Sequence, residues 1–252
     1  MNILLVNDDG VSSKGLHSLK NRLIEEDHKV YVVAPNDAQS CQSQAITLGT
    51  PLRAHKYIYD GVECYGITGT PADCVFMGVL ELYKDIKFDL LISGINYGAN
   101  VGFDINYSGT LGSAREALSY GIPGLATSLF THDLDADFSV ACDWTVFVIN
   151  ELSKCGFKKD TVYNLNTPYV KKEDISGFAI SHMSGVRYFS GIEKRVDPYG
   201  KDYYFITGTL FEYFDKDTDS DMLGKNYVTL TPLTVDYTDY DEYNKLKKIF
   251  NP

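Results

Sequence analysis

Short apolar runs alternate with stretches of helical periodicity through the first two thirds of the chain. The run at 3–6 predicts a strand, the spacing of leucines at 16–24 predicts a helix, and the run at 29–34 before Pro35 predicts a second strand. A helix between two neighbouring strands makes them parallel, with a right-handed crossover. This order therefore indicates the beginning of an α/β sheet.

The alternation continues to about residue 165. Thr70 as N-cap, Pro71 in the first turn and Asp73 three residues after the threonine predict a helix whose apolar face reaches Tyr83. Later elements are predicted as strands at 90–95, 124–127 and 161–165 and as helices at 111–118 and 144–152. The fold class that this pattern predicts is α/β, with an open, doubly wound and mainly parallel sheet.

The C-terminal part, 177–252, is rich in tyrosine and strand-like. A turn at 198–200 predicts a β-hairpin, and a last helix is expected at 240–249. No repeat or low-complexity linker interrupts the chain, so we expect one domain over 1–252, with a core at 1–176 and a hairpin and C-terminal extension after it. Aromatic hairpins that cannot fold back on their own core often pack against another subunit, so this extension is expected to serve oligomerisation.

Composition narrows the class of protein. Of 252 residues, 44% are hydrophobic and 23% are charged, which is typical of a globular protein with one substantial core. The first apolar run is too short for a signal peptide or a membrane span, and the five cysteines form no C-x-x-C pair, so we expect a cytoplasmic protein with reduced thiols and no zinc site. A net charge of −11 argues against a nucleic-acid partner.

Polar residues follow the predicted strands at the edge where parallel sheets bind ligands. Asp8 and Asp9 follow the first strand, and Gly10 allows the turn that two adjacent carboxylates need to share one ligand. Oxygen-rich sites favour Mg²⁺ or Mn²⁺. Taken by itself, an Asp-Asp pair favours the other interpretation, in which both are solvated loop acids and one caps the next helix.

A second polar segment, "SGINYGANVGFDINYSGT", follows the strand at 90–95. From Ser93 to Gly112 there are five glycines, and the segment leads into a helix, so backbone N–H groups and the hydroxyls of Ser108 and Thr110 could hold an anion. The alternative is an ordinary Ser/Thr N-cap on a flexible loop. A metal held by carboxylates beside an anion site would be suited to hydrolysing a phosphate ester.

Four motifs in order, "ILLVNDDG", "VVAPNDAQS", "SGINYGANVGFDINYSGTLGSAREALSYGIPGLATS" and "TDSDMLGKNYVTLTPL", resemble the SurE family of stationary-phase survival proteins. These are metal-dependent 5'/3'-nucleotidases. The resemblance implies a Rossmann-like core and one divalent metal ion per subunit, Mg²⁺ or Mn²⁺, bound by Asp8, Asp9, Ser40 and Asn96. It assigns catalytic roles to Asp8, Asp9 and Asn96.

The same resemblance implies phosphate contacts from Asn96 and from Ser108, Gly109 and Thr110. The substrates implied are nucleoside 5'-monophosphates, with 3'-monophosphates and short polyphosphate as further possibilities, and neither a nucleic acid nor a membrane is an expected partner. Homodimers or homotetramers through exchanged C-terminal segments are implied as well.

Three positions depart from the family pattern. Cys41 stands where glycine usually follows the metal-binding serine, and Met222 and Asn226 stand where alanine and glycine are usual. The first could alter the loop around Ser40, and the other two bear on the packing of the C-terminal exchange.

Other classes of α/β protein fit less well. A response-regulator receiver needs an aspartate where Asn96 lies, a haloacid-dehalogenase-type phosphatase needs its two aspartates two residues apart, and a dinucleotide-binding domain needs a G-x-G-x-x-G after the first strand. A non-catalytic nucleotide- or anion-binding regulatory module remains the alternative function. Whether Asp8 acts as a base or as a nucleophile is left open by the sequence.

Overall fold

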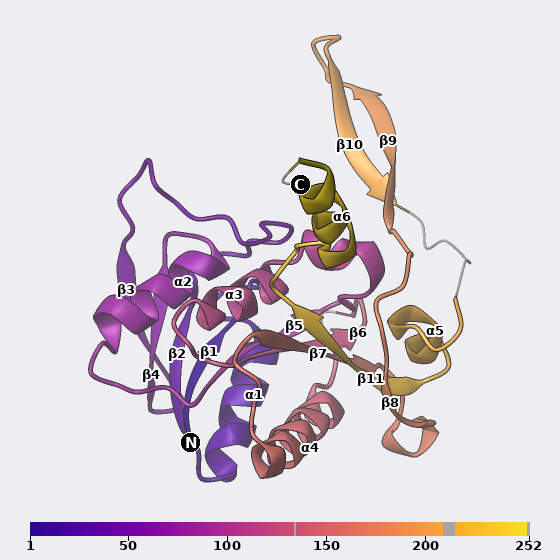
Figure 1. Cartoon of the computed structure of the whole chain (residues 1–252). Coiled ribbons are helices and arrows are strands. Elements are labelled where there is room, and N and C mark those ends of the chain that lie inside the picture. The colour runs from indigo at the N-terminus through magenta and orange to yellow at the C-terminus, as the bar shows by residue number, and fades with distance from the viewer. Residues whose placement is uncertain (134, 209–214, 251–252) are drawn as a thin grey trace.

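The computed structural model describes residues 1–133, 135–208 and 215–250. A nine-stranded sheet in the order β3-β4-β2-β1-β5-β6-β7-β11-β8 forms its centre, and β9 and β10 form a separate hairpin (Figure 1). The strands are β1 (Asn2–Val6), β2 (Lys29–Pro35), β3 (Ala54–Tyr59), β4 (Val62–Ile67), β5 (Leu90–Tyr97), β6 (Gly124–Phe130), β7 (Thr161–Pro168), β8 (Gly177–Ile180), β9 (Phe189–Val196), β10 (Asp202–Gly208) and β11 (Tyr227–Thr234). The α-helices are α1 (Lys14–Glu25), α2 (Pro71–Met77), α3 (Gly109–Leu118), α4 (Ser139–Cys155), α5 (Asp219–Gly224) and α6 (Tyr240–Phe250).

Six neighbouring strands, from β4 to β7, are parallel, which confirms the predicted α/β class. The chain first builds outward from β1 to β2 and β4 and then from β5 to β6 and β7, so the direction reverses between β1 and β5. In open α/β sheets, ligands bind beyond the strand ends at such a reversal. The strands β8 and β11, from the C-terminal part of the chain, extend the same sheet.

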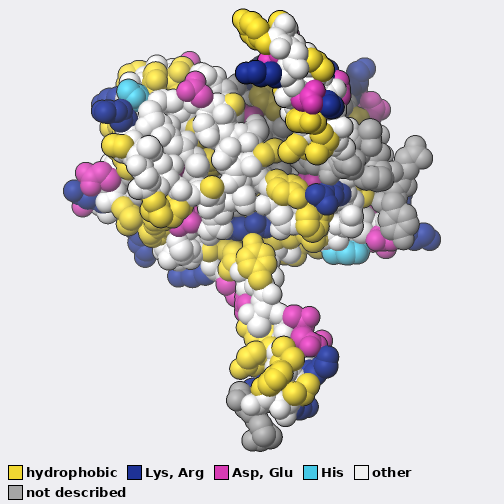
Figure 2. All heavy atoms as spheres, turned by 90° about the horizontal axis from the view of Figure 1, so that it is seen from above, with side chains coloured by type: hydrophobic (Ala, Val, Ile, Leu, Met, Phe, Trp, Pro, Cys, Tyr) yellow, Lys and Arg dark blue, Asp and Glu magenta, His cyan; other side chains and the backbone are white. Residues whose placement is uncertain are grey.

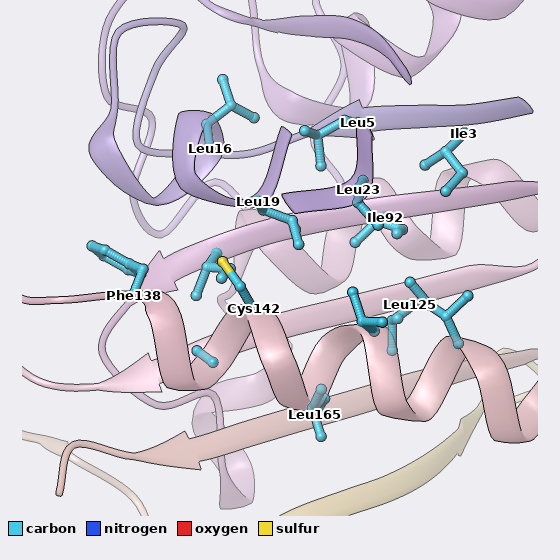
Figure 3. Packing of buried hydrophobic residues seen from close by; sticks show 14 of the residues in the cluster. Ile3, Leu5, Leu16, Leu19, Leu23, Ile92, Leu125, Phe138, Cys142 and Leu165 are labelled. Atoms are coloured by element: carbon cyan, nitrogen blue, oxygen red, sulfur yellow. The ribbon is translucent and has the colours of Figure 1, made fainter. Parts of the chain in front are cut away.

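Two layers of helix cover the sheet. One face packs against α1 and α4, where Leu16, Leu19 and Cys142 belong to one buried hydrophobic cluster with Ile3 and Leu5 of β1 (Figure 3). The other face packs against α2 and α3. Because the central strands are buried on both faces, they are continuous apolar runs in the sequence.

Some predicted boundaries were wrong. The strand predicted to end at Ile95 continues to Tyr97, with a shift in its pairing to β6 between Ser93 and Asn96, so Asn96 lies within β5. The helix that starts at Thr70 has the expected capping box, but α2 ends at Met77 and a π-helical turn at Gly78–Leu82 follows it.

The helix predicted at 144–152 is part of α4, and its apolar face packs against the main core at Trp144 and Leu152 but is only partly buried. Trp144 stacks on Phe178 of β8 at 5.7 Å between ring centroids, and Phe147 remains 42% exposed. The strands β3 and β4 were not predicted at all.

The predicted hairpin and last helix are present as β9–β10 and α6. Both stand clear of the body with hydrophobic side chains on their surfaces (Figure 2), and none of the residues of α6 is buried. Within the described ranges, no helix has both the length and the apolar character needed to cross a bilayer.

Candidate functional site

A cavity of about 390 Å³ lies at the carboxyl edge of the sheet, where the chain direction reverses between β1 and β5. Its polar lining comes from the ends of β1 and β5, the loop after β2 and the start of α3, with Asp8, Asn96, Ser40 and Ser108. Further along the sheet, the lining is largely apolar. Apolar and aromatic side chains there come from Val101, Phe130, Val186, Tyr188 and Leu223, with Asn100, Asp104, His132 and Ser220 as the polar ones. The volume is suited to one small molecule rather than to a polymer.

Asp8 is a buried carboxylate at the polar end of this cavity. Its Oδ1 accepts a 2.7 Å hydrogen bond from the Thr110 hydroxyl, and its backbone oxygen accepts the Gln39 N–H at 2.7 Å. Burial raises the pKa of Asp8, and the hydrogen bonds from Thr110 oppose this shift. The first strand, the loop after β2 and α3 therefore meet at this one residue, the loop through the Asp8 backbone and α3 through its carboxylate.

Asp9 lies beside Asp8, and its Oδ2 accepts the Tyr97 N–H at 3.3 Å. Burial, together with the charge of Asp8, raises the pKa of Asp9 to about 7. No lysine, arginine or histidine of the described chain forms an ion pair with either carboxylate. Two neighbouring acids without a protein cation are a favourable arrangement for an added cation.

Ser40 and Asn96 add two further oxygen atoms that could bind a metal ion. The Asn96 Nδ2 donates to the Gly98 carbonyl at 2.9 Å, which leaves its Oδ1 available to a ligand. The loop that carries Ser40 is fixed at Ser43, whose N–H donates to the Tyr107 carbonyl at 2.9 Å. Both residues line the cavity together with Asp8.

Cys41, at the position where the sequence resemblance implies glycine, also lines the cavity. Its φ of +61° lies in the left-handed region that favours glycine, so the departure in sequence leaves the backbone conformation of a glycine in place. Burial, and the charges of Asp8 and Asp104, raise the pKa of the Cys41 thiol.

The donor set fits a hard divalent cation. Two carboxylates, a hydroxyl and an amide oxygen are the ligand types that Mg²⁺ and Mn²⁺ prefer. Within the described residues, no group of three or more His, Cys, Asp or Glu side chains is placed to hold a metal. A cation at this position would therefore need Ser40 and Asn96 in addition to the two aspartates.

Three of the four residues expected to contact phosphate lie at the start of α3, and the fourth, Asn96, lies in β5. Ser108 lines the cavity, but its Oγ accepts the Leu111 N–H at 3.2 Å and so caps the helix as well. Gly109 lies against Asp8, where an added Cβ would be 3.0 Å from the Asp8 Cβ. Thr110 is fully buried, and its hydroxyl contacts Asp8 rather than the cavity.

Two buried groups behind the cavity were missed in the sequence. Asn100 lines the cavity, and its backbone carbonyl accepts N–H groups from Asn164 and Asn166 of β7 at 2.8 and 3.0 Å. Asp219 is fully buried at the start of α5. The signal for Asn100 was the presence of asparagines in and directly after the apolar run at 161–165. The signal for Asp219 was an aspartate directly after a threonine N-cap.

Comparison with known proteins gives consistent matches over nearly the whole chain. The family described as "Survival protein SurE" matches residues 3–190. A "5'-nucleotidase SurE" from Petrotoga mobilis is 39% identical over 98% of both chains, and one from Desulfatibacillum aliphaticivorans is 40% identical over 98% of both. The crystal structure of the SurE protein from Aquifex aeolicus superposes with a TM-score of 0.85, at 34% identity over 99% of each chain.

Proposed function

The chain belongs to the SurE family, and we propose on this premise that it is a 5'-nucleotidase that hydrolyses nucleoside 5'-monophosphates to nucleoside and phosphate with a divalent cation. The observation that carries this proposal is the pair of neighbouring carboxylates, Asp8 buried and Asp9 half-buried, with no ion-pair partner in the described residues and with hydroxyl and amide oxygens beside them. We extend the proposal to 3'-monophosphates and short polyphosphate as secondary substrates.

In the proposed mechanism, Asp8, Asp9, Ser40 and Asn96 would hold one Mg²⁺ or Mn²⁺ per subunit. A cation there would neutralise phosphate charge and supply an activated water. Thr110 keeps the Asp8 carboxylate oriented through its 2.7 Å hydrogen bond. Asp8 either accepts the proton of a water that attacks phosphorus, or attacks phosphorus itself to form an aspartyl phosphate that water then hydrolyses. In both routes the bond between phosphorus and the nucleoside oxygen breaks, and the nucleoside leaves after its oxygen takes up a proton.

Phosphate would be held at the start of α3. There Ser108 and the backbone of Gly109 and Thr110 lie beside Asp8, and the positive end of the helix dipole favours an anion. Asn96 serves both metal and phosphate in this proposal. Thr110 contributes through its backbone and through Asp8, since its hydroxyl is already used.

We propose a cytoplasmic homodimer or homotetramer assembled through the C-terminal part of the chain. The hairpin and α6 support this: Ile192 and Ile206 are 71% and 75% exposed, and Tyr240 and Ile249 are both 58% exposed. Apolar side chains on projecting elements gain stability when a second subunit covers them. The five free cysteines agree with a reducing compartment.

The test is phosphate release from a panel of nucleoside monophosphates with Mg²⁺, Mn²⁺ or EDTA, for the wild type and Asp8→Asn. We expect turnover that requires the cation, and a loss of about a thousandfold or more in Asp8→Asn. Activity that survives both EDTA and Asp8→Asn would refute the metal-dependent mechanism. Nucleotide binding without turnover of any phosphoester would favour a regulatory binding module.

A further inference from the structure

Asp219 is a buried acid that the proposed chemistry does not use. It is fully buried at the first residue of α5, and no lysine, arginine or histidine of the described chain forms an ion pair with it. Its charge is satisfied instead by backbone N–H groups. An acid in this situation orders the segments that supply those groups, since a buried carboxylate without them would be costly.

Three segments that are distant in sequence meet at this carboxylate. Oδ2 accepts the Gly102 N–H at 2.9 Å, while Oδ1 accepts the Ser184 N–H at 3.0 Å and the Ser220 N–H at 2.7 Å. The backbone N–H of Asp219 also donates to the His182 carbonyl at 2.9 Å. One side chain thus connects the loop after β5, the segment after β8 and the start of α5.

These three segments also contact one another closely. The Phe103 N–H donates to the Val186 carbonyl at 2.8 Å, and the Tyr188 N–H donates to Asp104 at 2.6 Å. At Gly102, where φ is +58°, an added Cβ would be only 2.4 Å from the Val186 oxygen. The path of the segment after β8 is therefore set by its contact with the loop after β5.

Each segment contributes to the cavity. We call Val186, Tyr188, Ser220 and Leu223 the C-terminal wall; all four line the cavity, and none belongs to the proposed metal or phosphate groups. Two of its residues, Ser220 and Leu223, belong to α5, which packs against β11 and β7 (Figure 1). The polar end of the cavity lies instead at the ends of β1 and β5. A phosphate held at the polar end leaves the remainder of a substrate directed along the cavity toward the wall.

We infer that Asp219 is a positioning residue that holds the C-terminal wall in place to receive the base of a nucleotide substrate. This inference rests on the proposed function and deepens it. A largely apolar surface with few polar groups suits a flat heterocycle. Binding energy from a part of the substrate that does not react can then be used to improve turnover at phosphorus.

The test compares adenosine 5'-monophosphate with ribose 5-phosphate, which has the same primary phosphate ester on a ribose but no base. With saturating Mn²⁺, we expect wild-type kcat/KM to favour the nucleotide by about tenfold or more. In Asp219→Asn, an NH₂ group replaces one of the two carboxylate oxygens. This group cannot accept a hydrogen bond, so the backbone N–H groups that it faces lose their acceptor. We expect this variant to lose most of the preference, chiefly through KM for the nucleotide, while ribose 5-phosphate changes by no more than about twofold.

Asp221→Asn is the matched control on the same helix. Asp221 pairs with Lys225 at 2.8 Å, and it does not line the cavity, so the preference should stay at the wild-type value. If Asp219→Asn does not fold, Leu223→Ala shortens the wall directly and should lower the same preference.

The outcomes separate the two proposals. Equal use of both substrates by the wild type, or an equal loss for both in Asp219→Asn, overturns the role of the wall and leaves the phosphatase intact. An unchanged preference in Leu223→Ala also overturns it. Hydrolysis of neither substrate by the wild type overturns the proposed function and this inference with it.

Discussion

Gly112 in α3 provides a sensitive test of how the loop that carries Ser40 is positioned. A Cβ at Gly112 would be 2.0 Å from the Ser43 carbonyl oxygen and 2.5 Å from the Ser43 carbonyl carbon, so both close contacts are with backbone. Ser43 is itself held by the Asn106 and Tyr107 carbonyls, at 2.8 and 2.9 Å. In Gly112→Ala the loop or the helix has to move.

The size of the movement follows from the geometry. The separation must grow from 2.0 Å to about 3.4 Å, where ordinary van der Waals contact begins. Since α3 packs on β5 and β6, we expect the loop to move, and Ser40 with it. A misplacement of about 1 Å in a catalytic group can cost about 100-fold in rate.

Stability should respond less than activity. Alanine favours a helix over glycine by about 1 kcal/mol, while overpacking of a close contact costs about 1–3 kcal/mol. The net loss in the free energy of unfolding is therefore expected to be about 2 kcal/mol at most. We expect kcat/KM for phosphate release to fall about 100-fold and the apparent affinity for Mn²⁺ to weaken.

The assay is phosphate release from adenosine 5'-monophosphate across a Mn²⁺ titration, together with thermal unfolding. Gly224→Ala is the control, because an added Cβ at Gly224 meets no atom within 4 Å. A Gly112→Ala enzyme with kcat/KM within about threefold of the wild type would refute the proposed dependence of the site on this loop.

Three further predictions concern other parts of the molecule. Thr110→Val removes the hydroxyl that donates to Asp8 and should weaken Mn²⁺ binding about 10- to 100-fold by calorimetry, whereas Thr110→Ser should not. Asn226 has a φ of +62°, so Asn226→Ala should lower the free energy of unfolding in urea by about 1 kcal/mol and Asn226→Gly should change it by less than half as much. The hydrogen bond from the Lys20 ammonium lowers the pKa of the Asp60 carboxyl in the folded state. This ion pair therefore stabilises the fold above the pKa that Asp60 has in the unfolded chain, and its contribution is lost as the pH falls through the folded pKa. Asp60→Asn should therefore lower the free energy of unfolding at pH 7 and have little effect near pH 3, as measured by urea unfolding at both pH values.

The central sheet could be predicted because burial on both faces leaves a direct trace in the sequence. The central strands, such as β1, β2, β5 and β6, are covered by helices on both faces and are apolar runs in the sequence. By contrast, β3 is exposed along nearly its whole length and shows no such run, so it was missed together with β4. Asp60 and Gly61, both at positive φ between the two strands, are a typical hairpin turn that could have revealed them.

In the candidate site, too, some features could be predicted from the sequence and others could not. Topology brings Asp8 and Asn96 to one edge, and this could be inferred from strand order alone. The contact between Thr110 and Asp8, and those of Asp219 with Gly102 and Ser184, join residues far apart in the chain. A single sequence carries no information on such pairings, because they depend on how loops cross after the sheet has formed.

The position of β11 has a consequence for the order in which the protein can assemble during synthesis. In the sheet, β11 lies between β7 and β8, although it follows both in the chain. When β8 leaves the ribosome, its only partner strand in the described sheet has not yet been made. The nascent chain must therefore leave the edge of β7 open until residues 227–234 emerge and fill the gap, and only then can β8 join. Closure of this edge would be a late, concerted step of folding, and substitutions in β11 should slow maturation more than those in β1 or β2.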